Sequence, residues 1–208
     1  MVSETIRIKF QKIGSLQFIS HLDLIRTMNK VLKRAGVPLW YSEGFNPHPK
    51  LVFALTVSVG AESICELLDV RVTEHIDPQE TKMRLNQELT EELKVLDVYY
   101  PETKFSDVSS AAYRFTFDQE ITGAEKLFAS PCMILKKSKS GETQVDISPM
   151  VLALSAQGHE VNAVLRADSQ AYLNPEFVAK VIANAYQAPD YSILRTEIYG
   201  KKIGEIFR

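Results

Sequence analysis

The chain has 208 residues, of which 45% are hydrophobic and 24% are charged, and these proportions are those of a soluble globular protein. Its two cysteines, Cys65 and Cys132, lie far apart, which excludes a disulfide framework and a zinc or iron–sulfur ligand set. No apolar leader and no uninterrupted apolar run of membrane-spanning length is visible, so we expect a cytoplasmic protein without a membrane segment.

The net charge of −2 conceals an uneven distribution. Residues 1–60 contain eight Lys or Arg residues and three acidic residues, which gives +5 and leaves −7 for the remainder. A basic N-terminal region on an acidic body indicates either one anion-facing surface or an ordinary scatter of charge. The sequence leaves both interpretations open.

Hydrophobic periodicity in the first half predicts alternating strands and helices. Residues 5–13 alternate, which predicts a half-buried strand with Arg7 and Lys9 on its polar face. Ser20 begins a helix with apolar residues at helical spacing, and Gly36 ends it. The other elements predicted in this half are a short strand over 37–42, a strand buried on both faces over 51–59, a strand over 64–73, a helix from Asp77 to about Leu93 and a strand over 95–100.

The second half predicts a similar order more weakly, after a polar boundary at residues 106–110. Its predicted elements are a strand over 111–118, a short helix over 123–129, strands or hairpin arms over 133–137, 144–147, 150–156 and 160–167, a helix that begins at Asn174, and a strand over 192–198. The two halves together predict an α+β fold. It would consist of two tandem ferredoxin-like (split βαβ) subdomains with mainly antiparallel sheets, at residues 1–105 and 111–208.

The stretch from Trp40 to Lys50, WYSEGFNPHPK, concentrates aromatic side chains, two prolines, a histidine and a lysine. Pro47 and Pro49 each fix φ and remove a backbone donor, so this stretch is neither a helix interior nor a central strand. We expect a stiff, projecting loop that presents His48 and Lys50 on a scaffold of apolar strands. An ordered connection whose aromatic residues complete the core is an equally open interpretation.

His21 lies in the first turn of the predicted helix, where the helix dipole disfavours a protonated imidazole. A neutral His21 suits a general base or a donor to a bound anion, and it suits a packing histidine bonded to a carbonyl equally well. The basic residues on the polar face of this helix form either a solvated surface or an anion-binding one. They are Arg26, Lys30, Lys33 and Arg34.

Three segments, SHLDLIRTMNKVLKRAGVPLWYSEGFNPHPK, LVFALTVSVGAES and ELLDVRV, resemble the DUF2344 family of radical-SAM-linked proteins. The resemblance covers most of residues 5–118 and becomes diffuse beyond them. Members of that family occur as small separate proteins or fused to the C-terminus of a radical SAM protein, so the resemblance implies an accessory role beside a radical SAM enzyme. The motif residues that carry over are Ser20, His21, Asp23, Arg26, Gly36, Tyr41, Gly44, Phe45, Asn46, Pro47, His48, Pro49 and Lys50.

A radical SAM enzyme needs three clustered cysteines for its iron–sulfur cluster, and this chain has two distant ones. We therefore expect a non-catalytic partner of such an enzyme that binds or presents its substrate, with structured RNA as a candidate, because aromatic rings stack on bases and Lys or Arg meets phosphates. No metal site and no cofactor is expected. The candidate ligand- or RNA-binding residues are His21, Arg26, Lys30, Tyr41, Phe45, Asn46, His48 and Lys50.

Two alternatives remain open. Tandem ferredoxin-like domains resemble CRISPR RNA-processing endonucleases of the Cas6 type, and a metal-independent RNA endonuclease would use His21 or His48 as general acid or base. Lys50 would then stabilise charge on the phosphate. The glycine-rich RNA-binding loop of those enzymes is not evident near the C-terminus. The second alternative is a purely structural interaction protein that binds no nucleic acid.

Overall fold

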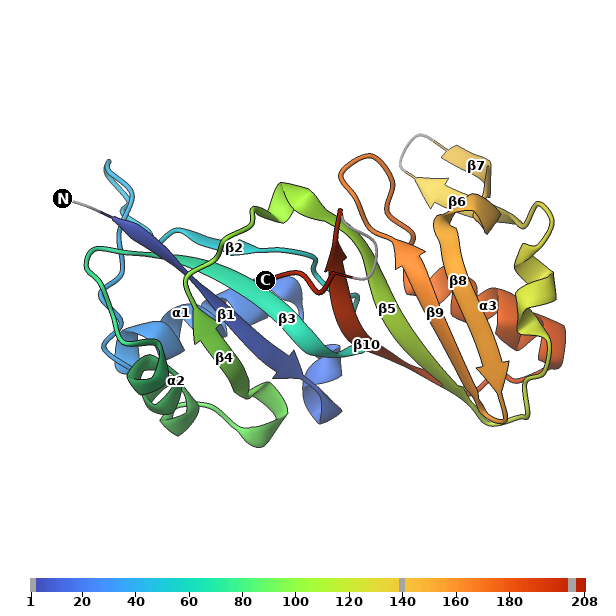
Figure 1. The fold of residues 1–208 in the computed structure, drawn as a ribbon, viewed down its shortest axis with the longest axis horizontal. Helices are drawn as coiled ribbons and strands as arrows, with labels where there is room; N and C mark the ends of the chain where they lie inside the picture. Colours follow the sequence, from blue (N-terminus) through green and yellow to red (C-terminus); the bar gives the residue numbers. More distant parts are fainter. Residues whose placement is uncertain (1–2, 139–140, 202–204) are drawn as a thin grey trace. The chain divides into compact units, whose positions relative to one another are not determined.

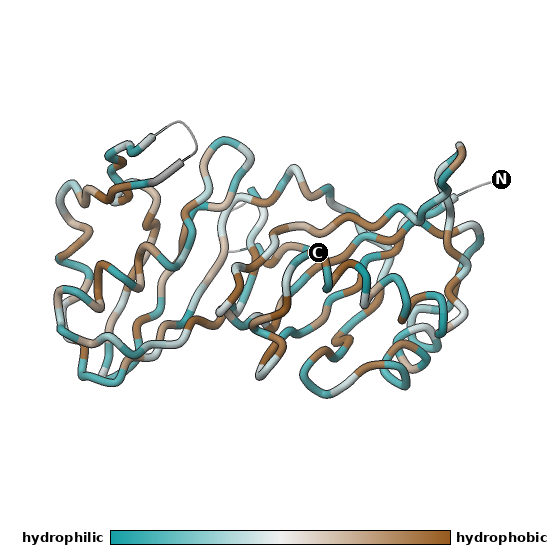
Figure 2. The backbone as a smooth tube through the Cα atoms, turned by 180° about the vertical axis from the view of Figure 1, so that it is seen from behind, coloured by the Kyte–Doolittle hydropathy of each residue, from teal (hydrophilic) through white to brown (hydrophobic). Residues whose placement is uncertain are grey.

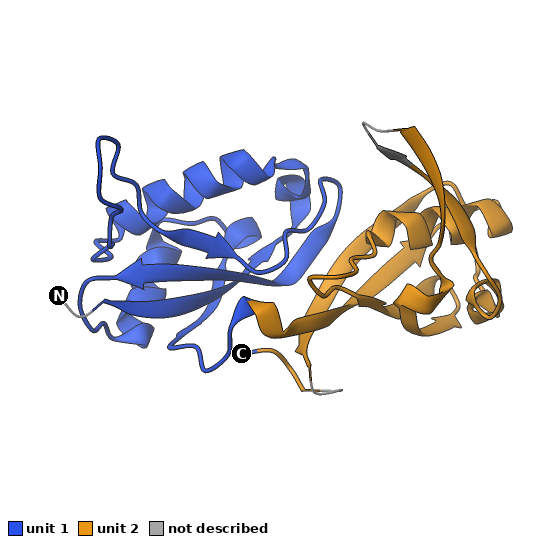
Figure 3. Ribbon diagram, turned by 90° about the horizontal axis from the view of Figure 1, so that it is seen from above, with its two compact units in different colours: residues 1–105, 208 blue, residues 106–207 orange. Residues whose placement is uncertain are grey.

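The computed structural model describes residues 3–138, 141–201 and 205–208. The chain divides into two compact units, which are residues 1–105 with Arg208 (unit 1) and residues 106–207 (unit 2; Figure 3). Both units combine helices with antiparallel strands, so the predicted α+β class is confirmed. In the part of the chain that the structure describes, no helix is long and apolar enough to cross a membrane.

Unit 1 is a four-stranded antiparallel sheet with two helices (Figure 1). In chain order its elements are β1 (Glu4–Lys12), the 3₁₀ turn η1 (Gly14–Phe18), α1 (His21–Arg34), β2 (Leu51–Phe53), β3 (Glu62–Val72), α2 (Pro78–Gln87), η2 (Glu91–Leu93) and β4 (Val95–Tyr99). The strands lie in the order β4-β1-β3-β2. The central pair β1 and β3 is therefore flanked by β4 on one side and by the short β2 on the other.

Side-chain capping fixes where the helices of unit 1 begin. The Ser20 hydroxyl accepts a hydrogen bond from the Asp23 backbone N–H at 3.1 Å and donates to the Asp23 carboxylate at 2.7 Å. Ser20 therefore caps the helix that it was predicted to begin, and Asp23 occupies the position where a capping box usually has Glu. Asp77 caps α2 in the same way through the Glu80 backbone N–H, at 2.7 Å. Gly36 follows α1 at a φ of +67°, a left-handed conformation that glycine adopts without steric cost.

The alternation in the strands divides the sheet of unit 1 into a core face and an open face. Ile6, Ile8 and Phe10 of β1 are fully buried, and they share one hydrophobic core with residues of β3 and both helices. Because successive side chains of a strand point to opposite faces, the residues between them face away from the helices. The open face therefore carries the polar positions of the strands, which include Thr5, Arg7, Asp69 and Arg71.

Three predicted elements of unit 1 are wrong in extent. The strand expected over 51–59 ends at Phe53, and Val59 is 61% exposed. The prediction was too long because an apolar run does not by itself show that every residue in it is buried. The strand expected over 37–42 is reduced to isolated bridges, Leu39 with Val72 and Tyr41 with Pro49. The helix expected to reach Leu93 stops at Gln87, and Leu93 is buried in the separate turn η2.

Unit 2 repeats the strand order with a different set of connections. Its elements are η3 (Phe105–Asp107, which begins in unit 1), β5 (Val108–Phe117), η4 (Ala124–Phe128), β6 (Met133–Ser138), β7 (Gly141–Asp146), η5 (Ser148–Met150), β8 (Val151–Gln157), β9 (Glu160–Arg166), α3 (Pro175–Tyr186) and β10 (Tyr191–Gly200). Four strands form an antiparallel sheet in the order β10-β5-β9-β8, and β6 and β7 form a separate hairpin. A short 3₁₀ turn and a hairpin thus occupy the place in the chain that α1 has in unit 1.

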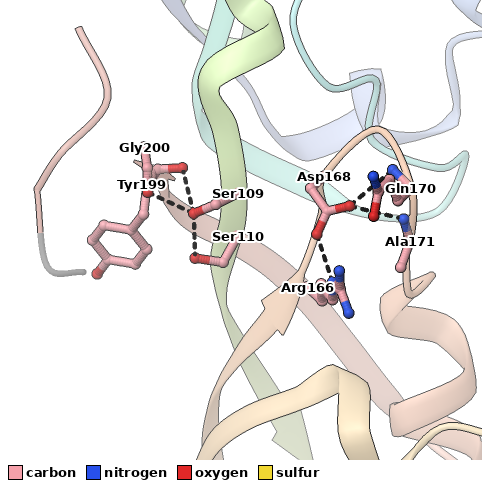
Figure 4. Close-up of polar contacts among 8 residues, drawn as sticks. All are labelled: Ser109, Ser110, Arg166, Asp168, Gln170, Ala171, Tyr199 and Gly200. Atoms are coloured by element: carbon pink, nitrogen blue, oxygen red, sulfur yellow. Dashed lines mark hydrogen bonds and ion pairs between the residues drawn. The ribbon is translucent and has the colours of Figure 1, made fainter. Parts of the chain in front are cut away.

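Unit 2 contains two clusters of hydrogen-bonded polar residues, one around Ser109 and one around Asp168 (Figure 4). The Ser109 hydroxyl donates to the Gly200 carbonyl at 2.5 Å. The Asp168 carboxylate accepts from the Arg166 guanidinium and from the backbone N–H groups of Gln170 and Ala171, at 2.5, 2.8 and 2.9 Å. The hydrogen bond from Arg166, with the backbone bonds, holds the pKa of Asp168 below its ordinary value. Both clusters connect segments within unit 2, Ser109 with the end of β10 and Asp168 with the turn that follows β9.

Candidate functional site

The predicted loop is present as an ordered projection between α1 and β2 (Figure 1). Its two arms are joined by the bridge between Tyr41 and Pro49 and by a hydrogen bond from the Ser42 N–H to the His48 carbonyl, at 2.9 Å. The Ser42 hydroxyl also accepts from the His48 N–H at 3.2 Å and lies 3.1 Å from His48 Nδ1. These hydrogen bonds connect the two arms of the loop to each other.

The tip of this loop exposes a large hydrophobic side chain, that of Phe45. Phe45 has a relative exposure of 111%, so its ring contacts essentially nothing, and it follows Gly44, which adopts a φ of +118°. Figure 2 shows the loop with a hydrophobic tip between hydrophilic flanks. Tyr41 is 39% exposed at the base, where Lys33 of α1 lies over its ring at 5.6 Å. Of the aromatic residues in this stretch, Tyr41 and Phe45 thus face outward, whereas Trp40 is half-buried.

A pocket of about 580 Å³ opens on the sheet face of unit 1 next to the base of the loop. Its floor comes from β2 and β3, and the segment that follows β4 forms a wall. The lining residues are Ser3, Thr5, Lys50, Val52, Asp69, Arg71, Pro101, Glu102, Thr103, Lys104 and Phe105. Lys50 belongs to both the loop motif and the pocket, so the two features are continuous.

Arg71 is the most firmly held cation of this pocket. Its guanidinium lies 4.3 Å from the centre of the Trp40 ring, and its Nε and Nη2 donate to the Ser3 hydroxyl at 2.8 and 2.6 Å. Strand register explains the arrangement, because the Trp40 N–H donates to the Arg71 carbonyl and the Arg71 N–H donates to the Lys50 carbonyl. The backbone of β3 therefore fixes Trp40, Lys50 and Arg71 relative to one another.

A buried ion pair lies beside the pocket. Arg7 of β1 is fully buried, and it meets the Asp69 carboxylate in a two-pronged contact, Nε to Oδ1 at 2.7 Å and Nη2 to Oδ2 at 2.9 Å. The same guanidinium donates to the Thr103 hydroxyl and carbonyl, both at 3.0 Å, and lies 4.2 Å from the Phe105 ring centre. The pair thus neutralises Asp69 and attaches the wall segment to the sheet.

The structure places the two candidate histidines at opposite ends of α1. The His21 ring meets the ring of Phe53, the last residue of β2, edge to face at 5.2 Å. The loop with His48 lies at the other end, where Lys33 contacts Tyr41. Since α1 has 14 residues, its ends are about 20 Å apart. His21 and His48 therefore do not converge, and the histidine next to Lys50 is His48.

The basic face of α1 is partly neutralised. Arg26 pairs with Asp23 at 3.1 Å, and Arg34 pairs with Glu88 at 2.7 Å. Hydrogen bonds from Ser20 and then from Arg26 hold the pKa of Asp23 below its ordinary value, so the Asp23 charge persists beside Arg26 into mild acid. Lys30 is exposed on the same helix, away from the pocket lining.

Of the predicted binding residues, Tyr41, Phe45, Asn46, His48 and Lys50 share the loop, and only Lys50 also lines the pocket. His21, Arg26 and Lys30 lie on α1 and are not brought to the pocket.

Sequence reasoning missed Ser3, Arg71 and Thr103. The signal for Arg71 was present in the alternation of residues 69–72, DVRV, which places Asp69 and Arg71 on one face of the strand. Within the described ranges, no three His, Cys, Asp or Glu side chains come together as a possible metal site.

Comparison with known proteins gives one family match. A family model described as "Uncharacterized protein conserved in bacteria (DUF2344)" matches residues 5–175. No curated protein matches the chain. A solved structure described as "Crystal Structure of an Unknown Protein from Galdieria sulphuraria" is similar at 7% identity, covering 93% of this chain and 99% of that chain, with a TM-score of 0.32. At that TM-score the likeness bears on neither the fold nor the function.

Proposed function

The chain belongs to the DUF2344 family. From the resemblance of its helix and loop motifs to radical-SAM-linked proteins, we propose that it is a non-catalytic accessory protein of a radical SAM enzyme, whose substrate it binds or presents. The observation that supports this proposal is the loop of residues 41–49, which is cross-linked internally and leaves Phe45 fully exposed. A rigid aromatic side chain on a preorganised loop loses little entropy on binding, so it suits an anchor for another molecule.

The sequence supports a non-catalytic role within such a pair. A radical SAM cluster requires three clustered cysteines. This chain has two, Cys65 buried in unit 1 and Cys132 half-buried in unit 2. Burial, and then the charge of Asp146, raise the pKa of the Cys132 thiol, which opposes a ligand role because a thiol binds metal as its thiolate. The radical chemistry would therefore belong to the partner.

We propose that both units are versions of the ferredoxin-like split βαβ arrangement. The support is the strand order, β4-β1-β3-β2 in unit 1 and β10-β5-β9-β8 in unit 2, with antiparallel neighbours throughout each. In unit 2 the first helix of that arrangement is replaced by η4 and the β6–β7 hairpin. Such sheets bind ligands on the face that the helices leave uncovered, which in unit 1 is the face of the pocket.

An anaerobic pull-down from the native host tests the proposed function, with tagged wild-type chain and the Phe45→Ala variant. We expect the wild-type chain to recover a radical SAM protein, and Phe45→Ala to recover much less of it. Phe18→Ala is the matched control, because Phe18 is also an exposed phenylalanine, at 67%. It lies in η1, which precedes the N-terminus of α1, whereas the loop follows the C-terminus of that helix. Equal recovery by all three chains, or no radical SAM protein with any of them, would refute the proposal.

RNA in the same eluates tests the nature of the substrate. Recovery of RNA together with the partner supports RNA presentation. The endonuclease alternative is tested by incubating that RNA with the purified chain in EDTA. Cleavage that is lost in His48→Ala would replace the accessory proposal with a catalytic one, since His48 is the histidine beside Lys50.

A further inference from the structure

We infer that the pocket on the open face of unit 1 is a binding site for a phosphate group, with Lys50 and Arg71 as its principal ligands. This inference does not depend on the proposed accessory role, because it rests on the pocket and not on the exposed tip of the loop. It assigns a ligand chemistry to the residues that line the pocket, most of which lie outside the loop motif of residues 40–50.

The charges around the pocket favour an anion. Lys50, Arg71 and Lys104 contribute three positive charges to the lining, and Asp69 and Glu102 contribute two negative ones. The Asp69 charge is already balanced by the two-pronged contact with buried Arg7, described above. Over the described stretches of the chain, neither Lys50 nor Arg71 forms an ion pair. Two unneutralised cations at one pocket create a local positive potential on a chain of net charge −2.

Arg71 is oriented for binding before any ligand arrives. The Trp40 ring supports one face of its guanidinium, and Ser3 accepts from two of its five N–H donors. The remaining donors are available to phosphate oxygens, which Arg contacts through parallel hydrogen bonds. Because the side chain is already held, little conformational entropy is lost on binding. The hydroxyl groups of Ser3 and Thr5 add donors of the kind that phosphate sites use.

The volume of the pocket sets the class of ligand. A space of about 580 Å³ lies within the range of about 300–1,000 Å³ typical of small-molecule sites and is larger than a phosphate ion needs. Val52, Pro101 and Phe105 supply apolar lining for the remainder of the ligand. The phosphate would therefore be carried by a larger group, either a small phosphomonoester or one phosphodiester of an RNA strand.

Isothermal titration calorimetry at low salt tests the inference on the full chain. The probes are inorganic phosphate, adenosine monophosphate and a single-stranded RNA with hydroxyl groups at both ends. We expect binding of at least one of the two organic probes, weakened about tenfold or more in Lys50→Ala and in Arg71→Ala, because each variant loses charge-assisted hydrogen bonds to the phosphate. Arg71→Lys, which keeps the charge but loses the fork, is expected to weaken binding as well.

The controls separate this site from general charge effects and from the loop. Lys82→Ala removes a positive charge from α2, on the helix side of the sheet, and should leave affinity unchanged. Phe45→Ala should also leave it unchanged, so failure of the pull-down and failure of this experiment are distinguishable. Circular dichroism of each variant verifies folding. Binding of the monophosphate alone assigns a phosphomonoester ligand, and binding of the RNA assigns the strand backbone. No binding of any probe, or equal binding by wild type, Lys50→Ala and Arg71→Lys, would overturn the inference.

Discussion

Replacing Arg7 with Met tests whether the buried ion pair holds the candidate site together. The Arg7 side chain has no exposed surface and that of Asp69 is 17% exposed, so the substitution leaves a carboxylate without its partner in a largely dry environment. It also removes the two donors that reach Thr103 in the wall segment. Breaking a buried pair on one side costs about 3–5 kcal/mol, mostly because the remaining charge is uncompensated. For a chain of about 200 residues, that corresponds to a fall in Tm of about 6–20 °C.

The double variant Arg7→Met/Asp69→Leu distinguishes loss of the pair from loss of packing. Each single variant leaves one buried charge, whereas the double variant leaves none, so it should be less destabilised than either single variant. The residual cost should be about 1–2 kcal/mol, for the two hydrogen bonds from Arg7 to Thr103 that are lost. Urea unfolding followed by circular dichroism measures all three free energies. Additive losses, or a cost below about 1 kcal/mol for Arg7→Met alone, would show that the pair does not stabilise unit 1.

Two further predictions concern single side chains. Thr81 in α2 is fully buried, and its hydroxyl has no hydrogen-bond partner among the described residues. Thr81→Val should therefore stabilise the chain by about 1 kcal/mol and raise the midpoint of urea unfolding without changing its slope. An unchanged or lower midpoint would contradict this prediction. Burial, then the hydrogen bond to the Glu176 carboxylate at 2.9 Å, raises the pKa of Tyr191 to about 12. The unfolded value is about 10, so this stabilisation is present below pH 10 and lost as the pH rises from 10 to 12. Tyr191→Phe should flatten that loss, and absorbance at 295 nm should show one fewer late-titrating tyrosine; identical titration curves would refute the assignment.

The sequence predicted most strongly those features of unit 1 that depend on local chemistry. Ser20 and Asp77 mark helix starts because a capping side chain acts within three residues of itself. The two prolines and Gly44 likewise predicted that the chain leaves regular structure between α1 and β2. The strand over 51–59 was overextended, because the place where β2 leaves β3 depends on tertiary pairing, which periodicity does not encode.

The candidate site was predicted only in part for the same physical reason. Lys50 was selected from its own loop, but its companions come from segments distant in sequence, Ser3 before β1, Arg71 in β3 and Thr103 after β4. Strand pairing brings them together, since Thr5 faces Arg71 across the β1–β3 ladder and Arg7 faces Asp69. His21 was selected because the first turn of a helix is a distinctive position, although its ring packs on Phe53 at the far end of β2.

The repeated strand order of the two units does not carry repeated chemistry. By strand order, β5 beside β9 holds the place in unit 2 that β1 beside β3 holds in unit 1, and the arginine of β5 is Arg114. Arg114 is 45% exposed and meets Glu160 at 3.7 Å, a surface pair of the kind that contributes little to stability. The cross-strand neighbour of Arg114 is Asn162, where Arg7 has Asp69. Without Arg7, the largely buried Asp69 carboxylate would lack its partner, which is costly. We therefore expect ligand contacts to concentrate on unit 1, where Arg7 balances Asp69, the acidic residue on the same strand face as Arg71.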